Sequence, residues 1–195
     1  MTDFESRIDT TRPHTARIWN YRTGGKDNYP VDRAAGDEIR ELHPGIGAYA
    51  KADRLFLGRA VRHLAEQEGI RQFLDIGTGL PSADNTHEVA QRVAPDARVV
   101  YVDNDPLVLA HAQALLVGTP EGRIDYLDAD LRDVDEAVAF WNEHGTPKLT
   151  QRPPAAVARY FDGLELLEPG VVSCSAWRAP TPTPDVAMYA GVGRK

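Results

Sequence analysis

Two acidic residues and two glycines are spaced as in a site for a nucleoside-containing ligand. Asp75 precedes Gly77 and Gly79 at the end of an apolar run, residues 72–76, and Asp103 ends a second apolar run. A glycine turn after a buried strand lets a ligand approach the backbone without meeting a Cβ atom, and the second acid can accept hydrogen bonds from both ribose hydroxyls. The alternative is a tight turn that binds nothing, because a short glycine motif alone is weakly specific.

The residues around the glycines favour a cationic ligand over a dinucleotide. A dinucleotide fingerprint would place a third glycine where the chain has Ser82, and the carboxylate of Asp75 would repel a pyrophosphate. S-adenosylmethionine carries an ammonium and a sulfonium, a ribose for Asp103 and an adenine amino group for an acceptor such as Asp130. We therefore expect S-adenosylmethionine as cofactor, with S-adenosylhomocysteine as product, in preference to NAD.

The order of elements predicts an α/β fold that brings these residues together. Apolar runs alternate with helical patterns, as in a parallel sheet covered by helices. Right-handed crossovers place the loops after the strands along the edge where open sheets bind ligands. The expected strands are residues 72–76, 98–103 and 123–127, and the expected helices between them are residues 84–93 and 105–117.

Helical patterns also precede this region, and shorter elements follow it. We divide the chain into an N-terminal helical extension, residues 1–70, and a Rossmann-like cofactor-binding domain, residues 71–195, which together form one globular unit. The expected N-terminal helices are residues 14–21, 30–42 and 46–67. Further helices are expected at residues 133–143 and 155–161, with a bent strand over 164–167 and 171–177 and a final strand over 186–192.

Composition excludes several other classes. The 195 residues carry a net charge of −7 without a long basic run, which argues against a nucleic-acid partner. Cys174 is the only cysteine, so there is neither a disulfide framework nor a thiolate cluster for a metal. No apolar segment is long enough to span a bilayer, and the first residues lack a secretory pattern. We expect a cytoplasmic protein without a metal or a membrane partner.

Two short motifs match other sites incompletely. The sequence from Gly24 to Lys26 matches the end of a phosphate-loop motif, but Asp27 stands where that motif has the Ser or Thr that binds magnesium. His87 and Glu88 match the first two residues of the zinc-protease motif, but the second histidine of that motif is replaced by Gln91. Neither motif predicts a nucleotide-triphosphate or zinc site.

Several blocks together resemble one known family. The chain resembles the class I S-adenosylmethionine-dependent methyltransferases, and more narrowly a large actinobacterial family of S-adenosyl methyltransferases. The resemblance covers nearly the whole chain in two blocks. Its motifs are residues 16–28 (ARIWNYRTGGKDN), 73–81, 100–106, 129–133, 159–166 and 189–194.

The resemblance implies a role for each matching position. Gly77 and Gly79 would lie against the methionine part of the cofactor, and Asp103 would hold the ribose. Asn104 would pack beside the adenine, whose edge would meet Asp130 and the backbone of Leu131. The segment containing Tyr21, Gly25 and Asn28 would fold over the site as a lid. The expected fold is then a shortened three-layer methyltransferase sandwich with a helical lid.

One region departs from the family pattern. A doubly wound methyltransferase carries a fourth and a fifth strand after Asp130, each with a helix, and here that region is too short for both. Either the final strands pair with strand one, or its edge stays open to water or to another chain. A compacted sheet, an edge completed by a homo-oligomer and a defective gene product all remain open.

Loss of this region leaves the acceptor and the catalytic residues unknown, since the family usually places substrate-facing residues there. The leading hypothesis is an S-adenosylmethionine-dependent methyltransferase of unknown acceptor, for which a small molecule is one candidate. The alternative is a protein that binds S-adenosylmethionine or S-adenosylhomocysteine but has lost turnover.

Overall fold

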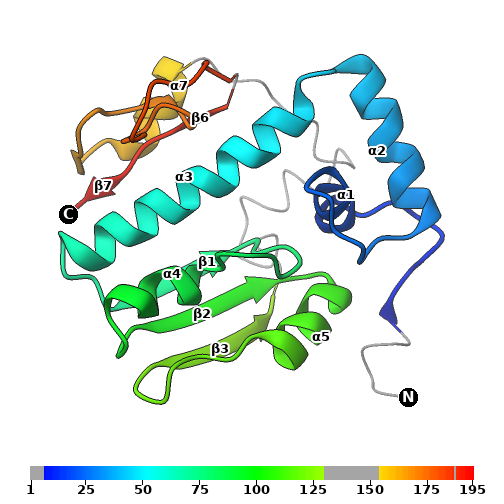
Figure 1. Cartoon of the computed structure of the whole chain (residues 1–195), viewed down its shortest axis with the longest axis horizontal. Coiled ribbons are helices and arrows are strands. Elements are labelled where there is room, and N and C mark those ends of the chain that lie inside the picture. Colours follow the sequence, from blue (N-terminus) through cyan, green and yellow to red (C-terminus); the bar gives the residue numbers. More distant parts are fainter. Residues whose placement is uncertain (1–6, 130–153, 187) are drawn as a thin grey trace.

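The structure, a computed structural model, describes residues 7–129, 154–186 and 188–195. Three helices precede the sheet and lie across one side of it (Figure 1): α1 (Thr15–Arg22), α2 (Pro30–Leu42) and α3 (Ile46–Glu66). Each lies within a residue of its expected bounds. Pro30 starts α2. The N–H of the first helical residue has no partner within the helix, so proline, which lacks this N–H, costs no hydrogen bond there.

A parallel three-stranded sheet forms the centre of the fold, which confirms the expected α/β class. Its strands are β1 (Gln72–Ile76), β2 (Arg98–Asp103) and β3 (Arg123–Asp128), in the order β1-β2-β3. Helices α4 (Thr86–Val93) and α5 (Pro106–Leu115) form the two crossovers. Ile76, Val102 and Leu127 lie in register, so the carboxyl ends of the strands meet at one edge.

Side-chain caps set where the crossover helices begin. Asp105 accepts a hydrogen bond from the Leu107 N–H at 2.9 Å, at the start of α5. Asn85 and Glu88 form a capping box at the start of α4. Asp84 has a φ of 59°, so this helix begins at Thr86 instead of at the expected residue 84. The caps leave the glycine turn outside the helix, where it can face a ligand.

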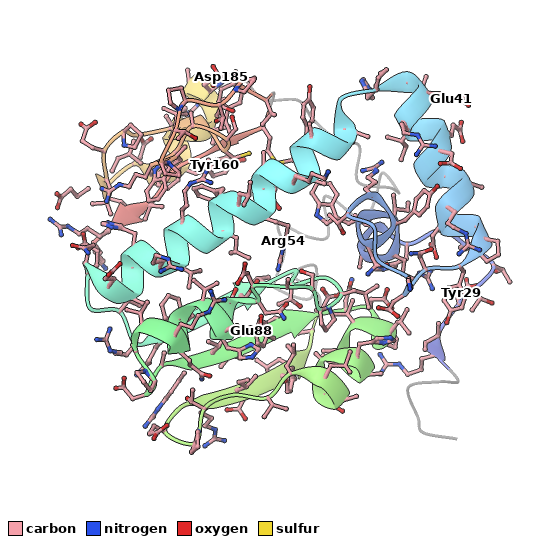
Figure 2. All side chains as sticks on the ribbon, viewed as in Figure 1. Tyr29, Glu41, Arg54, Glu88, Tyr160 and Asp185 are labelled. Atoms are coloured by element: carbon pink, nitrogen blue, oxygen red, sulfur yellow. The ribbon has the colours of Figure 1, made fainter. Side chains whose placement is uncertain are left out.

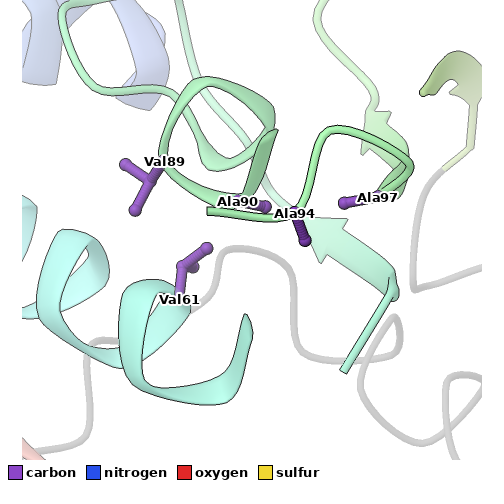
Figure 3. Close-up of a cluster of buried hydrophobic side chains, with 5 residues drawn as sticks. All are labelled: Val61, Val89, Ala90, Ala94 and Ala97. Carbon is purple, nitrogen blue, oxygen red and sulfur yellow. The ribbon is translucent and has the colours of Figure 1, made fainter. Parts of the chain in front are cut away.

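Small side chains let α3 approach α4 closely. Val61 of α3 packs against Val89 and Ala90 of α4, together with the buried Ala94 and Ala97 (Figure 3). Removing these surfaces from water supplies the main favourable free energy for docking α3 onto the sheet layer. This contact positions the cavity-lining part of α3.

A buried ion pair joins α1 to α2. Arg17 Nε lies 3.3 Å from Asp32 Oδ2, and both side chains are almost fully buried. Asp32 also accepts hydrogen bonds from the backbone N–H groups of His14 and Tyr29, each at 2.9 Å. The guanidinium of Arg17 also lies over the Tyr29 ring. Asp32 is therefore fully compensated, and it holds the start of α1 against the start of α2.

The C-terminal segment pairs with itself instead of with the central sheet. After α7 (Pro154–Ala158) and η3 (Arg159–Phe161), β4 (Glu165–Leu166) pairs with β7 (Gly193–Arg194), and β5 (Val172–Ser173) pairs with β6 (Tyr189–Ala190). The expected strands over 171–177 and 186–192 are wrong in length, because the chain leaves extended structure after two residues in each.

Contacts with α3 explain why β5 ends after two residues. Arg59 of α3 donates hydrogen bonds to the carbonyl oxygens of Cys174 and Trp177, at 2.5 and 2.6 Å. The indole of Trp177 is fully buried, and its ring meets Phe56 edge to face. These long-range contacts favour a turn over a straight strand, and they cover the upper side of α3 with the C-terminal segment (Figure 1).

One edge and one face of the sheet lack a partner within the described residues. No described strand pairs with the free side of β1. Leu74 and Ile76 of β1 and Leu127 of β3 share the face opposite Phe73 and are 63%, 46% and 52% exposed. The expected helix over 133–143 and the predicted loss of two strands fall on residues 130–153, outside the described residues. Among the described helices, none has the length and apolarity to cross a membrane.

Candidate functional site: a cavity at the carboxyl edge of the sheet

A cavity of about 550 Å³ lies between α1, α3 and the carboxyl ends of β1 and β2. Five of the residues expected to bind a cofactor line it: Asp75, Gly77, Gly79, Asp103 and Asn104. Helix α1 and the residue before it contribute His14, Thr15, Ala16, Trp19 and Asn20, with Thr23 just after the helix. Helix α3 contributes Asp53, Arg54, Phe56 and Leu57, and the lining is completed by Ile76, Thr78, Leu80, Ser82, Val102 and Ala129.

The turn after β1 requires both glycines. Gly77 and Gly79 have φ values of 72° and 67°, a region that residues with a Cβ rarely adopt. A Cβ at either position would meet nothing within 4 Å. Backbone conformation, and not crowding by the protein, therefore selects glycine, and the space in front of the turn is open. The Gly77 N–H continues the ladder to the Val102 oxygen at 2.8 Å, which anchors the turn to β2.

Asp103 is held at the end of β2 as an oriented acceptor. The Gly79 N–H donates to its Oδ2 and the Asp105 N–H to its Oδ1, both at 2.9 Å. The residue is only 7% exposed. A carboxylate has about four lone-pair positions, so each oxygen keeps capacity for a further hydrogen bond from a ligand. The same contacts tie the glycine turn to Asp103, so the two motifs form one unit.

Asp75 offers a second carboxylate to the cavity. The Thr86 hydroxyl donates to its Oδ2 at 2.5 Å. Burial raises the pKa of Asp75, while this hydrogen bond and the charge of Arg54 act in the opposite direction. Arg54 extends from α3 toward the sheet (Figure 2) and donates to the backbone oxygens of Ala83 and Asp84. The hydrogen bond from Thr86 and the charge of Arg54 offset only part of the cost of burying the Asp75 carboxylate. A cationic ligand group beside Asp75 would offset the rest.

Among the cavity residues that the sequence analysis does not name as site residues, Asp53 and His14 can take part in proton transfer. Asp53 precedes Leu57 by four residues, so it lies on the stripe of α3 that continues to Val61. An acid on an otherwise apolar stripe is the signal that would have identified it. His14 had no comparable signal, because its place depends on the packing of α1 against the start of α5.

The predicted lid residues lie beside the cavity and not among its lining residues. The Tyr21 hydroxyl donates to Asp37 Oδ1 of α2 at 2.9 Å. The side chain of Asn28 donates to Asn20 Oδ1 at 2.9 Å. A Cβ at Gly25 would overlap the Asn20 side chain, so this turn wraps closely around Asn20, which does line the cavity. A contact of Tyr21, Gly25 or Asn28 with cofactor stays a prediction.

The predicted adenine contacts are only partly described. Asn104 lines the cavity next to Asp103, as does Ala129 at the end of the described segment after β3. Asp130 and Leu131 lie outside the described residues. Among the residues that the structure does describe, no group of three metal-ligating side chains gathers at this edge or elsewhere.

An ion pair at the cavity rim predicts a pH-dependent stability. His14 Nδ1 lies 2.9 Å from Asp105 Oδ2, and this partner raises the pKa of His14 despite its partial burial. The stabilisation is fully present below the unfolded pKa of about 6.5 and is lost as the pH rises through the higher folded pKa. We expect thermal denaturation of the wild type to show a fall in Tm across this interval that His14→Gln lacks. Equal pH dependence of Tm in the two proteins would contradict this role.

The arrangement fits a ligand that combines a ribose with a cationic group. Asp103 presents acceptor oxygens, Asp75 supplies negative charge, and the open glycine turn leaves room at the backbone. An ionised carboxylate only accepts hydrogen bonds, which matches ribose hydroxyls and an ammonium and opposes a pyrophosphate.

The chain is similar to known proteins in both sequence and fold. A family model described as S-adenosyl methyltransferase matches residues 1–143 and 133–195. A crystal structure of a DUF574 family protein from Streptomyces avermitilis is similar at 35% identity and a TM-score of 0.85, over 97% of this chain and 100% of that one. A candidate methyltransferase from Thermobifida fusca is similar at 33% identity and a TM-score of 0.79, over 96% of both chains. No curated protein is a significant match.

Proposed function

Because the chain belongs to the S-adenosyl methyltransferase family, we propose that it is a methyltransferase that binds S-adenosylmethionine in the cavity at the sheet edge. One observation carries this proposal: the carboxylate of Asp103 and the open turn of Gly77 and Gly79 are hydrogen-bonded into a single unit that faces the cavity. The acceptor is proposed to be a small molecule, since the cavity is enclosed by helices on the side opposite the sheet.

The residues of the chain divide the binding task. Asp103 would accept hydrogen bonds from the ribose hydroxyls, and Asp75 would pair with the ammonium of the methionine part. Asn104 would lie beside the adenine, and Asp130 with the Leu131 backbone would meet its edge. The bound cofactor supplies a methyl group on a sulfonium, whose transfer depends mainly on the alignment of an acceptor nucleophile.

The N-terminal helices would limit the access of water to a bound cofactor. Trp19 of α1 and Phe56 and Leu57 of α3 give the cavity an apolar wall. Such a wall strengthens the attraction between Asp75 and a cation, because the local dielectric constant falls as water leaves. We propose that these helices form the lid that the family resemblance implies, and a contact of Tyr21, Gly25 or Asn28 with the cofactor stays a prediction.

One observation favours the alternative of cofactor binding without turnover. The free side of β1 has no partner strand among the described residues, and Leu74 and Ile76 beside it are exposed. In the family pattern, the strands expected at that edge carry substrate-facing residues. We also propose that the unpaired edge of β1 is covered by a second copy of the chain in a homo-oligomer.

Calorimetry with S-adenosylmethionine, S-adenosylhomocysteine and NAD tests the proposal. We expect both sulfur compounds to bind and NAD not to bind. Binding followed by methyl transfer to any member of a broad acceptor panel supports the methyltransferase. Binding without transfer to any of them favours the alternative, and failure of both sulfur compounds to bind would overturn both functions.

A further inference from the structure

We propose that Asp53 forms the acceptor subsite of this cavity, where its carboxylate receives the N–H or O–H proton of an amine or hydroxyl nucleophile. This inference rests on the proposed methyltransferase function and deepens it, because it names the class of acceptor. Its place on α3 would give the chain an acceptor site that does not depend on the segment after β3.

Asp53 differs from the other carboxylates of the cavity in its partners. Asp75 receives a hydrogen bond from Thr86, and Asp103 receives two from backbone N–H groups. Asp53 lines the same cavity but receives no hydrogen bond and forms no salt bridge within the described part of the chain. A carboxylate without a protein donor keeps all of its acceptor positions available to N–H or O–H groups of a ligand.

Asp53 reaches the cavity from a different element than the proposed ribose site. It lies on α3, whereas Asp103 lies at the carboxyl end of β2, hydrogen-bonded to the Gly79 and Asp105 N–H groups. The glycine turn and the strand ends form the proposed cofactor end of the cavity, and α3 forms its second end.

The chemistry of the second end suits a protic nucleophile. Burial raises the pKa of Asp53, against the opposing charge of Arg54, so its carboxylate is a stronger base than one in water. Trp19 and Phe56 supply apolar surface to the same cavity. Other ionisable groups bordering the cavity are His14 before α1, Asp75 of β1 and Asp103 of β2, with Cys174 on the outer side of α3.

Methyl transfer to a protic nucleophile needs only the cofactor, the acceptor and Asp53. The lone pair of the acceptor nitrogen or oxygen forms the new bond to the methyl carbon, and the carbon–sulfur bond breaks with its electron pair left on sulfur. The acceptor proton passes to a carboxylate oxygen of Asp53 and from there to water. An acceptor that is an anion lacks this proton and would be repelled by the same carboxylate.

Binding to the protein saturated with S-adenosylhomocysteine tests the subsite without turnover. The probe is tyramine, which carries an amine, a phenol hydroxyl and an aromatic ring, and the comparison compound is phenylacetate, which has an aromatic ring and a carboxylate but neither an amine nor a hydroxyl. We expect calorimetry to detect tyramine binding and no binding of phenylacetate. Asp53→Asn should weaken tyramine binding at least tenfold and leave the affinity for S-adenosylhomocysteine within twofold of wild type.

Asp96→Asn, at an exposed acid on the far end of the sheet, is the matched control and should change neither affinity. Equal tyramine binding by wild type and Asp53→Asn, or no tyramine binding by wild type, would overturn the subsite. A parallel loss of S-adenosylhomocysteine affinity in Asp53→Asn would also overturn it, by moving Asp53 to the cofactor end. Failure of wild type to bind S-adenosylhomocysteine at all would refute the proposed function instead.

Discussion

Asp103→Ala is expected to lower the affinity for S-adenosylhomocysteine at least 100-fold in calorimetric titration. The substitution removes the acceptor of two ribose hydrogen bonds, and a hydrogen bond to a charged group contributes about 1.5–3 kcal/mol. Because about 1.4 kcal/mol corresponds to a tenfold change in affinity, even the lower value for two bonds gives a 100-fold loss.

The same change also removes the partner of the Gly79 and Asp105 N–H groups, so folding needs its own control. Asp128 lies in register with Asp103 on the neighbouring strand but outside the cavity lining, and it pairs with Arg7. Asp128→Ala should bind S-adenosylhomocysteine like wild type. A folded Asp103→Ala protein, shown by an unchanged circular-dichroism spectrum, with wild-type affinity would refute the role of Asp103.

Arg17→Ala is expected to destabilise the protein by about 3–5 kcal/mol, because it leaves the charge of Asp32 buried without its ion-pair partner. For a chain of this length, that loss corresponds to a fall in Tm of about 10 °C. Thermal denaturation followed by circular dichroism measures it. The fall should be larger than that of any surface charge change, because both partners are almost fully buried.

Arg40→Ala provides the comparison for this prediction. Arg40 pairs with Asp37 at 2.7 Å on the surface of α2, where both side chains are about half exposed. Exposed pairs contribute about 0–1 kcal/mol, so its Tm should stay close to that of wild type. Equal Tm values for Arg17→Ala and Arg40→Ala would show that the buried pair does not hold α1 on α2.

Local patterns in the sequence were sufficient to predict the centre of the fold. The β1 and β2 bounds and the start of α2 agree with expectation, because apolar runs, helix caps and Pro30 act within a few residues. The convergence of Asp75, Gly77, Gly79 and Asp103 follows from the parallel order of the strands. This order is a topological consequence of short right-handed crossovers, so sequence alone could predict it.

Features that depend on distant contacts were not predictable in the same way. The chain after β5 turns because Arg59 binds two carbonyl oxygens more than a hundred residues away, which no local propensity reveals. The position of His14 at the cavity rim likewise depends on a distant contact, its ion pair with Asp105. Tyr21 and Asn28, which are expected at the cofactor, donate hydrogen bonds to Asp37 and Asn20, and their contact with the cofactor stays a prediction.

A crystal structure of the chain grown with S-adenosylhomocysteine is the most direct test of the central claim, that the cavity between the glycine turn and helices α1 and α3 is a cofactor site. The account predicts ligand density with the ribose hydroxyls within hydrogen-bond distance of Asp103 and the methionine ammonium beside Asp75. It also predicts free space in the cavity next to Asp53. Ligand density outside this cavity, or a ribose that does not contact Asp103, would contradict the account.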